Sequence, residues 1–308
     1  MSMLQTLLFA LIPIIVTIGI GYFAAYRNDF DDHDSQQFVK LVMNYALPFS
    51  VFAGIWGTPR KIIIADIPLA GWLLASMVGC YVILMIAYRF GFRLPLDLSA
   101  LRSLSVADPS VPFIGSAILP LLFGDQVSAI TIGLCTLIIN ILLLPAVFAS
   151  LAEEGEVTSI SERLISTFKK PLVLSALLGF VIALAGWQMP AELENTFMVL
   201  GKVAGGLALF SIGIVLFTRR ITISPSIGIS VFAKNVLFPC VIWLIMLAVH
   251  APAGIINIVV LTLAIPTATM PTTLAIQFKI KESEIASIQF WSTVCSFVSM
   301  PIFMWLIG

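Results

Sequence analysis

Charged residues are scarce in this chain. Asp, Glu, Lys and Arg together make up 10% of its 308 residues, whereas a soluble domain has about 25%. Hydrophobic residues make up 60% and form long runs in which few charges occur. A chain with so few charges cannot cover a folded surface in water, so the composition predicts an all-α polytopic membrane protein.

The chain also lacks the residues that several kinds of site require. Its formal net charge is zero, and no basic run predicts nucleic acid as a partner. The phosphate-binding motif G-x-x-x-x-G-K-[ST] is missing from the sequence, so we do not expect the chain to be an ATP-driven pump. The four cysteines form no C-x-x-C pair, and His33 and His250 fall at opposite membrane ends. We therefore expect no enzyme activity, no cofactor and no metal site.

Ten apolar runs approach the roughly 20 residues that a membrane-spanning helix needs. The first run lacks the preceding basic segment and the small-residue cleavage site of a signal peptide, so we expect it to be retained as a membrane helix. The ten predicted spans are Leu4–Tyr26, Phe38–Trp56, Ile67–Tyr88, Leu101–Phe123, Val127–Leu151, Pro171–Trp187, Phe197–Phe217, Ile227–Val249, Ile255–Phe278 and Ile285–Ile307.

Basic residues lie almost entirely on one side of these spans. If the N-terminus is outside, Arg60, Lys61 and Lys202 are the outer basic residues, and the other 13 of the 16 Lys and Arg lie at the cytoplasmic ends. Cytoplasmic loops of membrane proteins carry this excess of positive charge. The pattern predicts that both termini lie on the outer face and supports an even number of spans.

The two halves of the chain resemble each other. Pro109 and Pro266 are 157 positions apart, and the same shift places Ser110 on Thr267. Each half has five spans, an odd number, so the second half is inserted upside down relative to the first, as in many secondary transporters. The predicted parts are a first five-helix repeat over 1–151, a cytoplasmic connecting loop over 152–170 and a second, inverted repeat over 171–308.

Prolines interrupt two of the spans near their middle. Pro109 and Pro112 lie in the fourth span, and Pro266 and Pro271 lie in the ninth. A proline removes a backbone donor and clashes with the preceding turn, so we predict that both helices are broken. Irregular backbone at that depth is tolerated only where it lines a cavity or packs against protein. Broken helices at corresponding places in two halves predict a binding site at the midplane.

Each break starts a second half-helix whose free backbone amides face the centre. A helix N-terminus carries about half a positive charge, so two such ends with nearby hydroxyl groups form a suitable seat for a small anion. The predicted substrate-binding residues are Asn44, Asp108, Ser110, Thr267, Thr269, Thr272 and Thr273, and the predicted structural residues of the crossover are Pro109, Pro112, Pro266 and Pro271.

Two charged residues within the predicted spans allow two interpretations each. Asp108 precedes a proline, which fits the N-cap of the second half-helix; an acid inside a membrane is also a functional candidate, here for proton coupling. Lys234 either extends its ammonium to the membrane interface or pairs with a carboxylate of the substrate or of the protein.

Several short stretches, taken in order, resemble the auxin efflux carrier family over nearly the whole chain. They are Asn44–Pro48, Phe113–Gly115, Leu207–Gly213, Ala264–Phe278, and Ser292–Ser296 with Pro301. The resemblance implies ten transmembrane helices as two inverted five-helix repeats, with broken helices 4 and 9 crossing at mid-membrane. It further implies a secondary active transporter of a small organic anion, which works by alternating access in an elevator-like motion.

The short central loop is similar to the compact bacterial branch of that family. This branch points to malonate or a related dicarboxylate as the substrate and to the bacterial inner membrane, with periplasmic termini. The resemblance also implies a scaffold formed by helices 1, 2, 6 and 7, and a homodimer through it. One departure is the stretch Ala107–Pro112, which carries an extra proline and an acid, Asp108, where the family more often has Asn and Gly before the Phe-x-Gly.

Two other function classes stay open at this stage. A sodium-coupled bile-acid-type organic anion symporter shares inverted repeats and crossed helices, but its acidic residues are not matched around Pro266. Because a sodium site needs several oxygen ligands, we expect proton rather than sodium coupling. A passive channel or a ligand-sensing membrane module is the other class, and it would not accumulate solute against a gradient.

Overall fold

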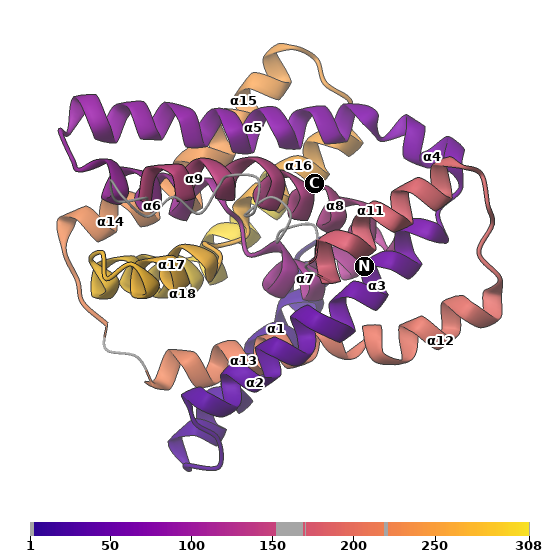
Figure 1. The fold of residues 1–308 in the computed structure, drawn as a ribbon, viewed down its shortest axis with the longest axis horizontal. Helices are drawn as coiled ribbons and strands as arrows, with labels where there is room; N and C mark the ends of the chain where they lie inside the picture. The colour runs from indigo at the N-terminus through magenta and orange to yellow at the C-terminus, as the bar shows by residue number, and fades with distance from the viewer. Residues whose placement is uncertain (1–2, 152–168, 170, 219–220, 308) are drawn as a thin grey trace. The chain divides into compact units, whose positions relative to one another are not determined.

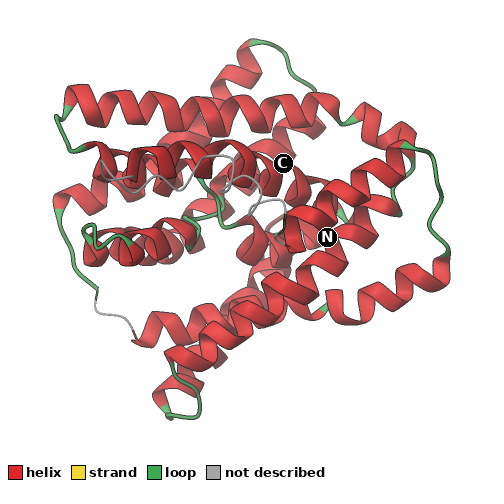
Figure 2. Cartoon of the chain, in the orientation of Figure 1, coloured by secondary structure: helices red, strands yellow, loops and turns green. Residues whose placement is uncertain are grey.

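The computed structural model describes residues 3–151, 169, 171–218 and 221–307. This part of the chain consists of helices and the loops that join them (Figure 2). The only extended pairing among the described residues is an isolated bridge between Pro109 and Thr267. The predicted all-helical fold class is therefore confirmed for the described residues. Apart from Lys169, the predicted loop 152–170 lies outside them.

Six helices are long and apolar enough to cross a membrane. The first three are Asp32–Trp56 (α2, Asp32–Leu41; η1, Val42–Ala46; α3, Leu47–Trp56), Ile67–Gly91 (α5, Ile67–Ile86; η2, Ala87–Gly91) and Asp125–Leu151 (α8, Asp125–Leu137; η4, Ile138–Leu143; α9, Leu144–Leu151). The fourth, Glu192–Phe217, lies within α12 (Ala191–Gly201) and α13 (Val203–Thr218). The last two are Pro225–Ala248 (α14, Pro225–Phe232; η5, Ala233–Leu237; α15, Phe238–Ala248) and Glu282–Ile307 (α18).

Four shorter apolar helices complete this set. They are Val16–Tyr26 within α1 (Met3–Tyr26), Val111–Phe123 (η3, Val111–Gly115; α7, Ser116–Phe123), Pro171–Leu184 (α11) and Ala253–Ala264 (α16). The remaining described helices are α4 (Arg60–Ala65), α6 (Leu96–Ala107) and α17 (Met270–Gln277).

Three of the long helices contain a π-helical turn just before a proline. The turns η1, η4 and η5 precede Pro48, Pro145 and Pro239. A proline cannot donate to the carbonyl one turn earlier, and its ring crowds that carbonyl, so a wider turn lets the helix continue with a bend. The asparagines in these turns are Asn44, Asn140 and Asn235.

Backbone contacts divide the chain into two compact units, each assembled from separate stretches of sequence. Unit 1 consists of Met1–Ala70, Val111–Leu137 and Phe168–Arg219, and unit 2 consists of Gly71–Ser110, Ile138–Thr167 and Arg220–Gly308. This is a division by packing. The division into two repeats is a different one and stays a prediction.

In unit 1, α1 packs along α13, and two glycines allow the close contact (Figure 1). A methyl group built on Gly213 would lie 2.1 Å from the carbonyl oxygen of Ile18, and one built on Gly21 would lie 2.1 Å from the carbonyl oxygen of Phe210. Both distances are far below van der Waals contact. The two backbones can therefore touch only because neither residue has a side chain.

Replacing Gly213 with alanine is expected to lower the midpoint of thermal unfolding in detergent by about 5 °C, because the new methyl group must force α1 away from α13. Gly206→Ala on the same helix is the matched control, since nothing lies within 4 Å of its added methyl group. Alanine is the better helix former, so this control should unfold at the same temperature or slightly higher. Equal midpoints for the two variants would contradict the close contact.

In unit 2, α18 is the element around which the others pack. It contacts α14, α16, α17 and α6, and Figure 1 shows α17 and α18 lying side by side. Two of these partners, α6 and α16, are the helices that stop at the predicted breaks. The position of α18 therefore decides how the two interrupted helices are held within this unit.

Candidate functional site

Both predicted interruptions are present. Helix α6 ends at Ala107 and helical structure resumes at Val111, so the first interruption comprises residues 108–110. Helix α16 ends at Ala264 and α17 begins at Met270, so the second comprises residues 265–269. The prediction that these two helices are broken is confirmed, and both interruptions belong to unit 2.

The four prolines fall into two kinds of position. Pro109 and Pro266 lie inside the interruptions, whereas Pro112 and Pro271 are the second residues of the helical segments that follow. The first amides of a helix have no partner within it, so a proline there costs no hydrogen bond and favours helix initiation. Pro112 and Pro271 thus start the second segments, and Pro109 and Pro266 lie where the first segments have stopped.

The two interruptions pair through a single antiparallel bridge. The Ser110 N–H donates to the Pro266 carbonyl at 2.8 Å, and the Ala268 N–H donates to the Asp108 carbonyl at 3.0 Å. Between these bonds lies the bridge pair of Pro109 and Thr267, and in this type of pair neither central residue donates to the other strand. A proline at position 109 therefore sacrifices no hydrogen bond of the crossing.

Thr267 ties the pair of interruptions to the helices around it. Its hydroxyl donates to the Ser105 carbonyl at 2.7 Å, and its N–H donates to the Ser292 hydroxyl on α18 at 3.0 Å. The Ser105 carbonyl is among the last four of α6, which lack a helical partner. Because Thr267 is only 1% exposed, no water is available to replace that bond.

Asn235, in the π turn η5, hydrogen-bonds to Ser292, the residue whose hydroxyl accepts the Thr267 N–H. The Ser292 hydroxyl donates to Asn235 Oδ1 at 2.6 Å, and Asn235 Nδ2 donates to the Ser292 carbonyl at 2.7 Å and to the Ser299 hydroxyl at 3.4 Å. Asn235 and Ser292 are both buried. Such fully bonded polar networks make one arrangement of the surrounding backbone strongly preferred.

Asn235 is not among the predicted site residues, although a pattern in the sequence points to it. An asparagine four residues before a proline occurs at Asn44 and again at Asn235. Both asparagines lie in π turns, and such turns are frequent at functional sites. The shared spacing would have placed Asn235 beside Asn44 among the candidates.

Lys234, the neighbour of Asn235, is completely buried. Its Nζ donates to the Leu263 carbonyl at 3.1 Å and lies 5.4 Å from the ring centroid of Phe238. Leu263 is in the last turn of α16, and the carbonyl end of a helix attracts cations. The interpretation that Lys234 extends to the membrane interface is therefore wrong. The hydrogen-bond acceptor found here is a backbone carbonyl, and pairing with a carboxylate stays a prediction.

Asp108 lies in the first interruption and is 2% exposed. Its own N–H donates to the Leu104 carbonyl at 2.9 Å, so it terminates α6. Helical structure resumes at Val111, which makes Ser110 the N-cap position of the next segment. The interpretation of Asp108 as that N-cap therefore does not fit. Lys234 lies in the same unit and is also buried, so unit 2 holds a buried acid and a buried base.

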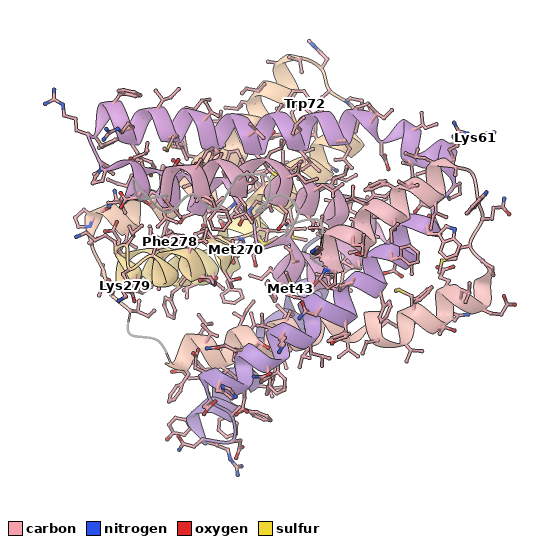
Figure 3. The ribbon with its side chains drawn as sticks, in the orientation of Figure 1. Met43, Lys61, Trp72, Met270, Phe278 and Lys279 are labelled. Atoms are coloured by element: carbon pink, nitrogen blue, oxygen red, sulfur yellow. The ribbon has the colours of Figure 1, made fainter. Side chains whose placement is uncertain are left out.

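The three remaining threonines lie at the start of α17, whose first residue, Met270, is labelled in Figure 3. Thr269 is half-buried and its carbonyl accepts the N–H of Thr273 at 3.0 Å, as expected of an N-cap residue. The buried Thr272 hydroxyl donates to Gln289 Oε1 at 2.7 Å, and the exposed Thr273 hydroxyl donates to the Thr269 carbonyl at 3.2 Å. This helix end thus offers free amides next to hydroxyl groups.

Most of the predicted site residues lie in one unit. Unit 2 holds Asp108, Ser110, Thr267, Thr269, Thr272 and Thr273. Asn44 belongs to the π turn η1 of unit 1 and is half-buried.

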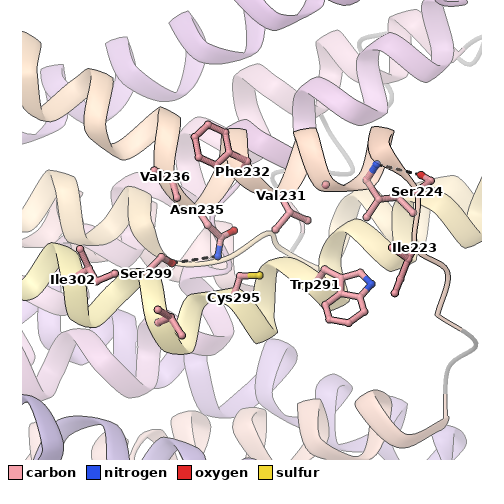
Figure 4. A pocket seen from close by; sticks show the side chains of 13 residues that line it. Ile223, Ser224, Val231, Phe232, Asn235, Val236, Trp291, Cys295, Ser299 and Ile302 are labelled. Carbon is pink, nitrogen blue, oxygen red and sulfur yellow. Dashed lines mark hydrogen bonds between the residues drawn. The ribbon is translucent and has the colours of Figure 1, made fainter.

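A cavity of about 590 Å³ lies in unit 2 between α14, η5 and α18 (Figure 4). Its polar lining residues include Asn235, Ser299 and Ser224, and the other lining residues, such as Trp291 and Val298, are mostly apolar. A space of this kind suits hydrocarbon better than a carboxylate, because a charged group there would lose its hydration. We therefore place the candidate substrate site at the interruptions and not in this cavity.

Residues 6–304 match the family described as Membrane transport protein. The chain belongs to this family. The resemblance to the auxin efflux carrier family is thereby confirmed. The uncharacterized transporter YfdV of Escherichia coli (strain K12) is 31% identical over 276 residues, which cover 88% of each chain. An uncharacterized transporter of Methanothermobacter thermautotrophicus is 25% identical over 301 residues, covering 94% of this chain and 95% of the relative.

Membership in this family makes the chain a multi-pass membrane protein of a transporter class and not of an enzyme class. For a membrane transport protein, the burial of the interruptions has a direct consequence. Asp108, Ser110 and Thr267 are each at most 2% exposed. In this structure these side chains are therefore closed off from solvent.

Proposed function

We propose that the chain is a secondary active transporter of a small organic anion, malonate or a related carboxylate. The observation that carries the proposal is the pair of interruptions, residues 108–110 and 265–269, which hydrogen-bond to each other within unit 2 and hold the buried Asp108, Ser110 and Thr267. Half-helix N-termini that point at an anionic group are the recurrent substrate sites of secondary transporters.

The proposed topology is ten transmembrane helices as two inverted five-helix repeats, with helices 4 and 9 crossing at mid-membrane. The six long helices and the four shorter apolar ones support it, because together they correspond to the ten spans predicted from the sequence. We propose the bacterial inner membrane as the location, with both termini periplasmic, since the basic residues favour the cytoplasmic side.

The proposed anion seat uses the start of α17. Free amides at a helix N-terminus and nearby hydroxyl groups donate hydrogen bonds to carboxylate oxygens, and the helix dipole adds favourable charge. Thr269, Thr272 and Thr273 supply the hydroxyls there, and Ser110 and Thr267 supply those of the interruptions. Asn44 is included on the pattern of its sequence alone.

The proposed mechanism is alternating access with an elevator-like movement. Burial of the interruptions supports it, since binding and release both require that these residues become accessible. We further propose that transport is coupled to protons through Asp108, and that a homodimer forms through the scaffold helices 1, 2, 6 and 7. Thus the expected partners are a small carboxylate, the lipid bilayer and a second copy of the chain.

The test is uptake of labelled malonate into proteoliposomes that contain the purified protein. We expect accumulation above the equilibrium level under an inward proton gradient, and competition by unlabelled succinate more than by lactate or an auxin-like acid. A sodium gradient without a proton gradient distinguishes the sodium-coupled alternative, and uptake that never exceeds equilibrium indicates a passive channel. No carboxylate uptake under either gradient would overturn the proposal.

A further inference from the structure

Lys234 carries an ammonium group that is buried, and the proposed function does not explain what stabilises this charge. It is the largest side chain among the described residues that is less than 2% exposed. Removing an ammonium from water is costly unless other groups replace its hydration and balance its charge. The lysine must therefore be held by groups that favour a cation at this position.

The surroundings of the ammonium are those of a binding site for a monovalent cation. The Leu263 carbonyl accepts a hydrogen bond from Nζ at 3.1 Å, and it belongs to the negative end of α16, which the interruption leaves open. The Phe238 ring faces the same ammonium, with its centroid 5.4 Å from Nζ, and ring faces attract cations. Asp108, buried in the first interruption of the same unit, is an acid that can balance this charge.

In secondary transporters, unwound backbone carbonyls and the C-terminal ends of half-helices coordinate the coupling cation. Here the same kinds of group surround a charge that is covalently attached to the chain. We propose that the ammonium of Lys234 is a tethered cation, which occupies the cation position at the end of α16 and makes the crossing independent of free Na⁺. This inference does not depend on which solute the protein carries.

The experiment removes the tether and offers the cation separately. Lys234→Ala deletes three methylene groups and the ammonium, so n-propylammonium has the size and charge of the missing part. In choline chloride, the midpoint of thermal unfolding of the purified variant should fall by roughly 10 °C relative to the wild type. Addition of n-propylammonium chloride should restore at least half of that loss, and NaCl should raise the midpoint in a concentration-dependent manner.

Lys234→Met is the matched control, because methionine fills most of the same volume without a charge. Its midpoint should respond to neither n-propylammonium nor Na⁺, and the wild type should not respond either. Equal midpoints of Lys234→Ala in choline, sodium and n-propylammonium would overturn the proposal. An equal rise in the alanine and methionine variants would also overturn it, since that is a general salt effect.

A second measurement covers the case in which Lys234→Ala cannot be purified. Asp108→Asn removes the negative charge that balances the Lys234 ammonium. Lys234→Met removes the positive charge that balances the Asp108 carboxylate. If the two groups form a cation site, the variant that carries both changes should lose less in unfolding midpoint than the sum of the two single losses. Strictly additive losses would contradict the proposal.

Discussion

Thr267→Val is expected to lower the unfolding midpoint by about 5 °C, because the change leaves the buried Ser105 carbonyl without a donor. Valine has nearly the shape of threonine, so the loss is one hydrogen bond and not packing volume. That bond joins the second interruption to α6, between residues that are 162 positions apart in the sequence. We therefore also expect the rate of solute uptake to fall roughly tenfold, as when a positioning contact is lost.

Two control variants separate this effect from a general loss of hydroxyl groups. Thr267→Ser keeps the donor and should stay close to the wild type in both midpoint and uptake. Thr273→Val removes an exposed hydroxyl, which donates to a carbonyl of its own helix, and should leave the midpoint unchanged within experimental error. A Thr267→Val variant as stable and as active as the wild type would show that the bond does not hold the crossing.

The positions of the two interruptions could be predicted from the sequence because a proline acts locally. Pro109 and Pro266 each remove a backbone donor and crowd the preceding turn, and the structure places both inside an interruption. Prolines alone do not decide the outcome, because at Pro48, Pro145 and Pro239 the helix continues after a π turn. The exact bounds could not be predicted. A proline is equally compatible with the end of one helix and the start of the next, and Pro112 and Pro271 proved to be of the second kind.

The partners of the polar residues could not be predicted, because they come from distant parts of the chain. Lys234 binds a carbonyl 29 positions away, and nothing in its own segment indicates that a helix ends beside it. Its burial depends on the second interruption, which exposes the Leu263 carbonyl. Likewise, Thr267 reaches Ser292 only because α18 packs against the interrupted helices.

Hydroxyl groups that were predicted as substrate ligands also have roles within the protein. Thr267 and Thr272 donate to Ser105 and Gln289 in the structure. A hydroxyl has one donor and two acceptor positions, so a donor already in use leaves only acceptors for a carboxylate, which cannot donate. The backbone amides at the start of α17 are therefore stronger candidates for direct contact with an anion than the hydroxyls of Thr267, Thr272 and Thr273, which already donate within the protein.

Asp108→Asn is expected to abolish the dependence of uptake on the proton gradient. An ionised Asp108 places a negative charge in the region where we propose that the anion binds, and protonation removes it, so wild-type uptake should increase as the external pH falls. The variant is permanently uncharged at this position. It should equilibrate the solute across the membrane without accumulating it, so that the accumulation ratio falls to about one, roughly a tenfold loss for a wild type that accumulates tenfold.

The measurement must separate protonation of the protein from protonation of the solute. Uptake should therefore be followed over the pH range in which the substrate stays a dianion, with and without a proton gradient. Asp97→Asn, near the start of the same helix α6, is the matched control, because its carboxylate accepts the adjacent Leu98 N–H. It should keep both the pH profile and the accumulation. If Asp108→Asn kept its full pH dependence, the proton would have to be carried by another group, and the proposed proton coupling through Asp108 would be overturned.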